Sequence, residues 1–194
     1  MKKITLLFAL IFTATVGFCQ SFMHGAGVTI LVGSSQGGDV TVAEGFTYFP
    51  RFNFLETESL SVSVGIPLSV GVSAAYSAGY SNSGGFSDQS SIGFVVNAPL
   101  IINLNMGRGS TKDNRSKLGY FVGGGVGYHH GDFVTTGYGY TASESINSFG
   151  PAANAGFRIG VGRAHKNIEV RLSYMKGLNE NKINLFGIAC AFNF

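Results

Sequence analysis

Large apolar side chains alternate with small or polar ones along most of this chain. The clearest run is in the segment 60–76, where every second residue from Leu60 to Val72 is Leu, Val or Ile and the residues between them, as far as Ser73, are Ser, Gly or Pro. The last segment repeats the pattern, with bulky residues at Phe186, Ile188, Phe192 and Phe194. A period of two residues is that of a β-strand, whereas a helix repeats every 3.6 residues. The pattern therefore predicts an all-β fold.

Eight segments beyond the N-terminal region carry this alternation. They are residues 22–33, 40–54, 60–76, 91–106, 117–130, 150–163, 167–177 and 182–194. Each is long enough to cross a bilayer at a tilt, which takes about 9–11 residues of strand. We therefore expect an eight-stranded antiparallel up-and-down transmembrane β-barrel.

The composition of the weaker face favours a membrane barrel over a soluble β-sandwich, which alternates in the same way. A soluble sheet exposes Lys, Glu and Arg on that face, but here it carries Ser, Gly, Ala and Asn. Only 12% of the chain is charged, against about 25% in soluble domains. Small residues suit a narrow barrel interior, so the bulky face is predicted to meet lipid.

The connections predict which end of the barrel faces outward. With an even strand number both termini lie at the periplasmic end, and outer-membrane barrels favour long outer loops and short inner turns. The predicted outer loops are 34–39, 77–90, 131–149 and 178–181, and the inner turns are 55–59, 107–116 and 164–166. The two longest connections fall outside, whereas 107–116 is long for an inner turn.

The first 19 residues have the pattern of a cleavable secretory signal peptide. Lys2 and Lys3 precede an apolar run from Ile4 to about Val16, and small residues then lead to Cys19. That run is short for a spanning helix, which takes about 20 residues. The alternatives to a cleaved signal peptide are a retained membrane anchor and a lipoprotein that is lipidated at Cys19. We expect residues 1–19 to be the signal peptide and 20–194 the barrel domain.

Four charged residues fall on the inward-facing positions: Arg51, Arg158, Glu169 and Arg171. An arginine facing hydrocarbon costs about 2–4 kcal/mol near the bilayer midplane, so these side chains are predicted to point inward and pair. A satisfied polar interior is the simplest interpretation, and an ion or ligand path is the alternative. Side chains just fill the interior of an eight-stranded barrel, which argues against an open channel.

Other candidate motifs predict little chemistry. The run Gly123–Gly127 lies within a strand pattern and lacks the following helix of a nucleotide-binding loop. His129 and His130, near an expected outer loop, suggest neither a metal site by their spacing nor a defined hydrolase triad. We predict no catalytic, cofactor-binding or metal-binding residues. The net charge is +3 without a basic block, which excludes a nucleic-acid footprint.

The predicted loop 131–149 is the candidate contact surface, with Thr135, Tyr138 and Tyr140 as its candidate residues. Long loops on a rigid scaffold often carry function, although a passive loop is the alternative. Cys190 shares the parity of Phe192 and Phe194 and is expected to face lipid.

The signal, the alternation and the ending Ile188-Ala189-Cys190-Ala191-Phe192-Asn193-Phe194 resemble the small eight-stranded outer-membrane barrels of Gram-negative bacteria, the OmpX/OmpA-type group. The resemblance implies an outer-membrane location, and Phe192 and Phe194 as the assembly signal that the barrel-assembly machinery reads. It also implies contact with outer-membrane lipids and lipopolysaccharide.

We expect a monomer with a structural or surface-interaction role, in which the outer loops meet an extracellular ligand. A small porin-like channel and a lipid-modifying outer-membrane enzyme are the alternatives.

Overall fold

The structure is a computed structural model, and it describes the chain except for residues 1–20, 35–39, 81–85, 138–139, 163–165 and 180–182. The described residues form β-strands and connections only. The strands are β1 (Ser21–Met23), β2 (Gly25–Ser34), β3 (Val40–Tyr48), β4 (Arg51–Glu56), β5 (Leu60–Gly65), β6 (Leu68–Tyr80), β7 (Phe86–Asn97), β8 (Leu100–Gly107), β9 (Leu118–Gly137), β10 (Tyr140–Gly160), β11 (Asn167–Lys176) and β12 (Asn184–Asn193). The described residues contain no helix long and apolar enough to cross a bilayer.

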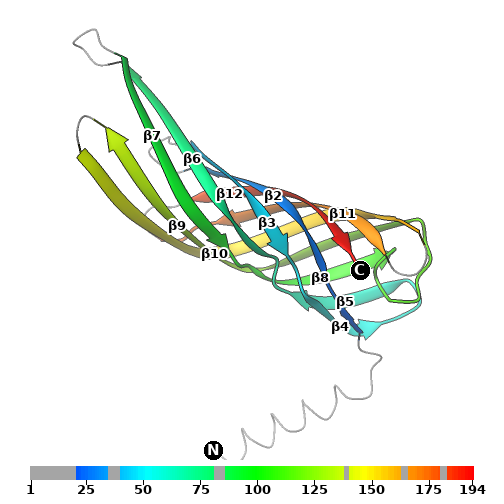
Figure 1. Ribbon diagram of the computed structural model, residues 1–194. Helices are drawn as coiled ribbons and strands as arrows, with labels where there is room; N and C mark the ends of the chain where they lie inside the picture. The colour runs from blue at the N-terminus through cyan, green and yellow to red at the C-terminus, as the bar shows by residue number, and fades with distance from the viewer. Residues whose placement is uncertain (1–20, 35–39, 81–85, 138–139, 163–165, 180–182) are drawn as a thin grey trace, which may run out of the picture.

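These segments form a closed antiparallel barrel of eight strands, as predicted (Figure 1). The pairs β1–β2, β3–β4, β5–β6 and β7–β8 each continue one barrel strand, and β9 to β12 supply the other four. The β12–β2 pairing joins the last strand to the first, and β9 pairs with both β7 and β8. The sheet therefore has no long open edge around its middle, which is the condition for strands to lie in lipid.

Proline explains why three barrel strands are each divided into two segments. The divisions fall at Pro50, Pro67 and Pro99, and proline has no N–H with which to continue a ladder. Single hydrogen bonds bridge the divisions, from Ile66 N to Pro50 O at 3.2 Å and from Ala98 N to Tyr128 O at 2.8 Å. The barrel wall is thus continuous, but it has fewer backbone hydrogen bonds at these positions on adjacent strands.

The burial of side chains confirms the predicted orientation of the strands. Ser61 and Ser63 are buried in the interior, whereas Ile66 and Leu68 are exposed on the outside. Cys190 is also exposed and unpaired, as its parity indicates. Apolar residues cover the outer surface, and the exposed aromatic residues include Phe52, Tyr120, Tyr128, Phe149, Tyr174, Phe192 and Phe194.

One carboxylate lies on this apolar surface, which the sequence pattern did not single out. Glu44 is exposed on β3 and stands in register with Ile30 on β2 and Val72 on β6. Both neighbours are themselves exposed apolar residues. Glu44 is therefore an exception to the expectation that charged side chains of the strands point inward.

The predictions of long outer loops at 77–90 and 131–149 are wrong. The β6–β7 hairpin keeps its pairing as far as Tyr80 and Phe86, and the β9–β10 hairpin as far as Gly137 and Tyr140. Both hairpins extend beyond the rest of the barrel, away from the C-terminus (Figure 1). Strands that leave the bilayer no longer need an apolar face, so the alternation that marks a membrane strand ends before the strand does.

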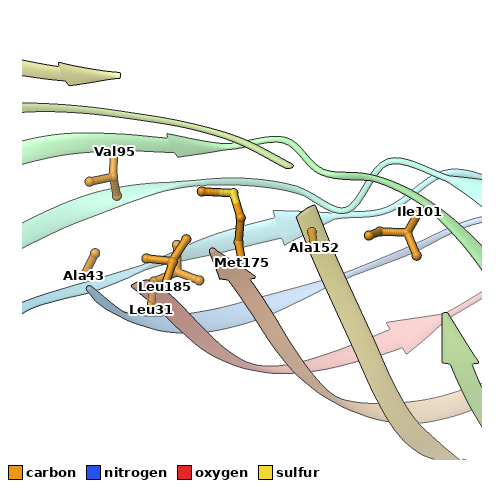
Figure 2. Close-up of a cluster of buried hydrophobic side chains, with 7 residues drawn as sticks. All are labelled: Leu31, Ala43, Val95, Ile101, Ala152, Met175 and Leu185. Atoms are coloured by element: carbon orange, nitrogen blue, oxygen red, sulfur yellow. The ribbon is translucent and has the colours of Figure 1, made fainter. Parts of the chain in front are cut away.

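Buried apolar side chains, here called the apolar layer, occupy part of the lumen. The layer consists of buried residues from seven strands: Leu31, Ala43, Val95, Ile101, Ala152, Met175 and Leu185. Figure 2 shows these side chains between the surrounding strands, with Met175 reaching across from β11 toward Val95. Side chains of this size occupy the narrow interior of an eight-stranded barrel.

Candidate functional site

The four charged residues predicted to face inward lie together in the lumen. Arg51, Arg158, Glu169 and Arg171, here called the arginine cluster, are all buried. Glu169 accepts from Arg158 Nε at 2.6 Å and from Arg171 Nη2 at 2.6 Å. The register that places Arg158 opposite Glu169 on β10 and β11 creates the first of these pairs. Arg171, two residues after Glu169 on the same strand, shares its inward face and completes the second.

Two phenylalanines hold the guanidinium groups in place. The Arg171 guanidinium carbon lies 4.3 Å from the centroid of Phe49 and 5.3 Å from that of Phe121. Arg158 lies 4.4 Å from the Phe121 centroid. A guanidinium over an aromatic face is attracted by the ring quadrupole, and the attraction grows when water is excluded. These contacts fix the arginine planes and leave defined nitrogen atoms facing the lumen.

The connection between β8 and β9 folds into the barrel and completes this site, which the sequence did not predict. In this inward turn (residues 108–117), Arg108, Ser110, Thr111 and Asn114 are buried. Gly109 O accepts from Arg51 Nη2 at 2.7 Å, and Ser110 O accepts from Asn53 Nδ2 at 2.8 Å. The unusual length of the predicted turn 107–116 was the signal available in the sequence. The turn closes the inner end of the lumen.

Gly109 allows the backbone to approach the cluster. Its φ is +72°, in the left-handed region that favours glycine. A Cβ at this position would stand 2.9 Å from Arg158 Cδ and 3.3 Å from Arg51 Nη2. The inward turn and the two arginines therefore fit together only when this residue has no side chain.

The arginine cluster holds more positive than negative charge. Three arginines surround one buried carboxylate, Glu169, so the four residues carry a net charge of +2. Neutral carbonyl and amide oxygens accept hydrogen bonds from some of the guanidinium N–H groups but leave the net charge unchanged. One of them is Asn105 Oδ1, which accepts from Arg158 Nη2 at 3.1 Å. Arg171 Nη1 and Arg51 Nε are buried without a hydrogen-bond partner. The lumen is thus electropositive and can receive a further acceptor.

The other predicted site residues lie apart from this cluster. Thr135 and Tyr140 are on the paired strands β9 and β10 and not in a loop, and Tyr138 lies outside the described residues. Phe192 and Phe194 are exposed at the end of β12, with the Phe194 ring 4.4 Å from that of His24. Their role as an assembly signal stays a prediction.

The candidate histidines and the glycine run do not form a site in the described residues. His129 is buried in the lumen, whereas the neighbouring His130 is outside it with Nδ1 2.8 Å from Asn147 Oδ1. Successive side chains of a strand point to opposite faces, so the two imidazoles diverge. Residues Gly123–Gly127 continue β9 without interruption. The part of the chain that the structure describes has no cluster of metal-ligating side chains.

Comparison with solved structures gives small outer-membrane barrels. The attachment invasion locus protein Ail of Yersinia pestis aligns over 91% of this chain and 99% of its own, with 13% identity and a TM-score of 0.49. OprG of Pseudomonas aeruginosa aligns over 91% and 96%, with 14% identity and a TM-score of 0.47. Neisserial surface protein A aligns over 90% and 97%, with 14% identity and a TM-score of 0.45. No protein-family model and no curated protein matches this chain.

The closed eight-stranded barrel, its apolar outer surface and its polar lumen define a small transmembrane β-barrel. The chain is therefore a membrane-spanning β-barrel protein, and its apolar outer surface supports the predicted location in the cell outer membrane.

Proposed function

We propose that this barrel is a membrane anchor with a closed lumen, and that it presents an extended sheet for pairing with a strand of an extracellular partner. The observation that carries the proposal is that four strands continue beyond the rest of the barrel as one sheet, whose two outer edges have no ladder partner among the described residues. The role is one of surface interaction and not of catalysis. Contacts with lipopolysaccharide, recognition by the barrel-assembly machinery and a monomeric state remain parts of the same proposal.

The open edges follow from where each ladder stops. Pairing between β6 and β3 reaches Ala75, whereas pairing between β6 and β7 continues to Tyr80. Pairing between β10 and β11 reaches Ala152, whereas pairing between β10 and β9 continues to Tyr140. The strands β6, β7, β9 and β10 thus form an extension whose two outer edges have no ladder partner among the described residues. Unpaired edges of this kind are templates for an added strand.

The backbone groups that face the β10 edge can be identified. Phe149 O accepts from Leu178 N at 2.9 Å, and Asn147 O accepts from Asn179 Nδ2 at 3.1 Å. Alternate residues of a strand direct their backbone groups to the same side. Ser145, Ser143 and Thr141 therefore direct theirs to the open edge, while the residues between them pair with β9.

The filled lumen argues against the channel alternative. The apolar layer occupies part of it, and the arginine cluster with the inward turn closes it toward the inner end. We expect no steady conductance from the purified protein in planar bilayers. Sustained ion flow would contradict the closed-lumen part of the proposal.

Strand addition can be tested with paired substitutions on the β10 edge. Ser143→Pro with Ser145→Pro removes two edge-facing N–H groups and leaves the β9 ladder its donors, because proline is tolerated where the N–H faces solvent. Ser143→Thr with Ser145→Thr is the matched control. We expect the wild-type protein and the control to retain a subset of an unbiased array of extended peptides, and the proline variant to lose that binding at least tenfold. Equal binding by all three proteins, or no binding by any, would refute strand addition at this edge.

A further inference from the structure

A cavity lies in the lumen between the apolar layer and the arginine cluster. Its volume is about 30 Å³, and its lining includes Leu185 and Met175 of the apolar layer and Arg171 of the cluster. About 10–15 Å³ on this measure is needed for one water molecule. The cavity therefore has room for about two waters, or for one small ion.

Three residues that line this cavity, Arg171, Asn154 and Asn97, have buried polar atoms without a hydrogen-bond partner among the described residues. Arg171 donates from Nε and Nη2 to Glu169, at 3.0 and 2.6 Å, and its third nitrogen, Nη1, is buried and unpaired. Asn154 lines the same cavity, and both atoms of its buried amide are unpaired. The cavity hydroxyls of Thr29, Thr47 and Ser69 are occupied in hydrogen bonds to protein atoms. Two donors, Arg171 Nη1 and Asn154 Nδ2, and two acceptors, Asn154 Oδ1 and Asn97 Oδ1, are thus left without partners in residues that line the space, and the one charged group among them is a donor.

We propose that this cavity is a binding site for a small monovalent anion, of chloride or formate size, held by Arg171 Nη1 and Asn154 Nδ2. Charge favours an anion over a cation or a neutral molecule, because the four residues of the adjacent cluster are buried and carry a net charge of +2. An uncompensated buried charge costs free energy unless it is paired, and a bound anion offsets that cost. The ligand also satisfies donors that are otherwise unmet, each of which carries a desolvation penalty.

The site is separate from the proposed surface role. It lies inside the wall, among residues of the lumen, whereas strand addition concerns the open edges of the outer extension. Binding of an anion stabilises the folded barrel because the unfolded chain has no such site. The two proposals can therefore fail independently.

The test uses the refolded full barrel in detergent, with sodium bromide as the probe and sodium gluconate, whose anion is too large for the cavity, at the same ionic strength. We expect the thermal unfolding midpoint to rise by about 3–6 °C for each tenfold increase in bromide above the dissociation constant. Asn154→Asp places a carboxylate in the cavity, so its midpoint should no longer depend on bromide. Asn103→Asp, at a buried inward-facing position outside the cavity lining, should keep the dependence.

A second measurement does not depend on any variant. Crystals of the wild-type protein grown in bromide should show an anomalous peak beside Arg171 Nη1. A midpoint that is the same in bromide and gluconate, together with no anomalous peak, would mean that the cavity holds only water and would overturn the proposal. An equal bromide response in the wild type and Asn154→Asp would assign the effect to nonspecific salt action and overturn it as well.

Discussion

Replacing Glu169 by Gln tests whether the arginine cluster stabilises the barrel. Glu169 is 1% exposed and is the acidic partner of both Arg158 and Arg171, each at 2.6 Å. Removing one member of a buried ion pair costs about 3–5 kcal/mol, because the remaining charge is left uncompensated. Two guanidinium groups lose their counter-charge here, and the glutamine NH2 cannot accept from either of them. We therefore expect a loss near the upper end, about 4–5 kcal/mol.

The loss can be measured by urea unfolding in detergent, followed by the gel mobility of unboiled samples. With an m-value of about 2 kcal/mol per molar urea, the midpoint should fall by about 2 M. Glu58→Gln is the control, since Glu58 is exposed at the inner end and such changes stay within about 0.5 kcal/mol. If Glu169→Gln lost less than about 1 kcal/mol, the cluster would not be the electrostatic core inferred from its geometry.

Three further outcomes follow from single positions. Gly109→Ala should cost about 2–4 kcal/mol in the same urea assay, because it combines a φ of +72° with a Cβ only 2.9 Å from Arg158 Cδ. Glu44→Leu should stabilise the barrel by about 1–2 kcal/mol in lipid vesicles, because it removes a carboxylate from the apolar surface. A fluorophore attached to Cys190 and refolded into vesicles should be quenched by brominated lipid and spared by aqueous iodide, because this side chain faces outward.

Each of these outcomes has a control or a contrary result. Gly162 has a similar φ of +67° but nothing within 4 Å of its Cβ, so Gly162→Ala should cost only about 1 kcal/mol. If both substitutions lowered the stability equally, the contact of Gly109 with the arginines would not explain the loss. Val42→Leu, at an exposed position beside Glu44, should change stability little; a matching gain there would assign the effect to added apolar area. Quenching of the Cys190 fluorophore by iodide alone would place β12 in water.

The strands within the bilayer were predictable because lipid imposes a strict rule on them. A residue of 60–73 either faces hydrocarbon or lies in the lumen, so apolar and small side chains alternate and the orientation of Ser61, Ser63 and Leu68 follows. The same rule predicted that Arg51, Arg158, Glu169 and Arg171 face the lumen. Their pairing required only that β10 and β11 be neighbours, which a short connection ensures.

The extended hairpins, the inward turn and the position of Glu44 were not predicted, because the apolar alternation of the membrane strands does not determine them. Thr135 and Tyr140 lie on the paired strands β9 and β10, but the sequence around them lacks the apolar alternation that distinguishes a membrane strand from a loop. The inward turn leaves no periodic signal either, since its place in the lumen depends on backbone oxygens of Gly109 and Ser110 meeting side chains of distant strands. The prediction placed the charged residues of the strands in the lumen. Glu44 occupies an outward-facing position of the alternation, so its place on the outer face was not anticipated.

The hydrogen bonds of the inward turn connect parts of the chain that are far apart in sequence. Gly109 accepts hydrogen bonds from Arg51 on β4 and Arg158 on β10, and Arg108 donates to the carbonyl of Lys166 beyond β10. Those partners lie between the second barrel strand and the start of the seventh, so they come together only after most of the wall has formed. A reporter group at Lys112, an exposed position on the turn, would thus respond late in folding, after individual hairpins have formed, and would report when β4 and β10 have assembled around the turn.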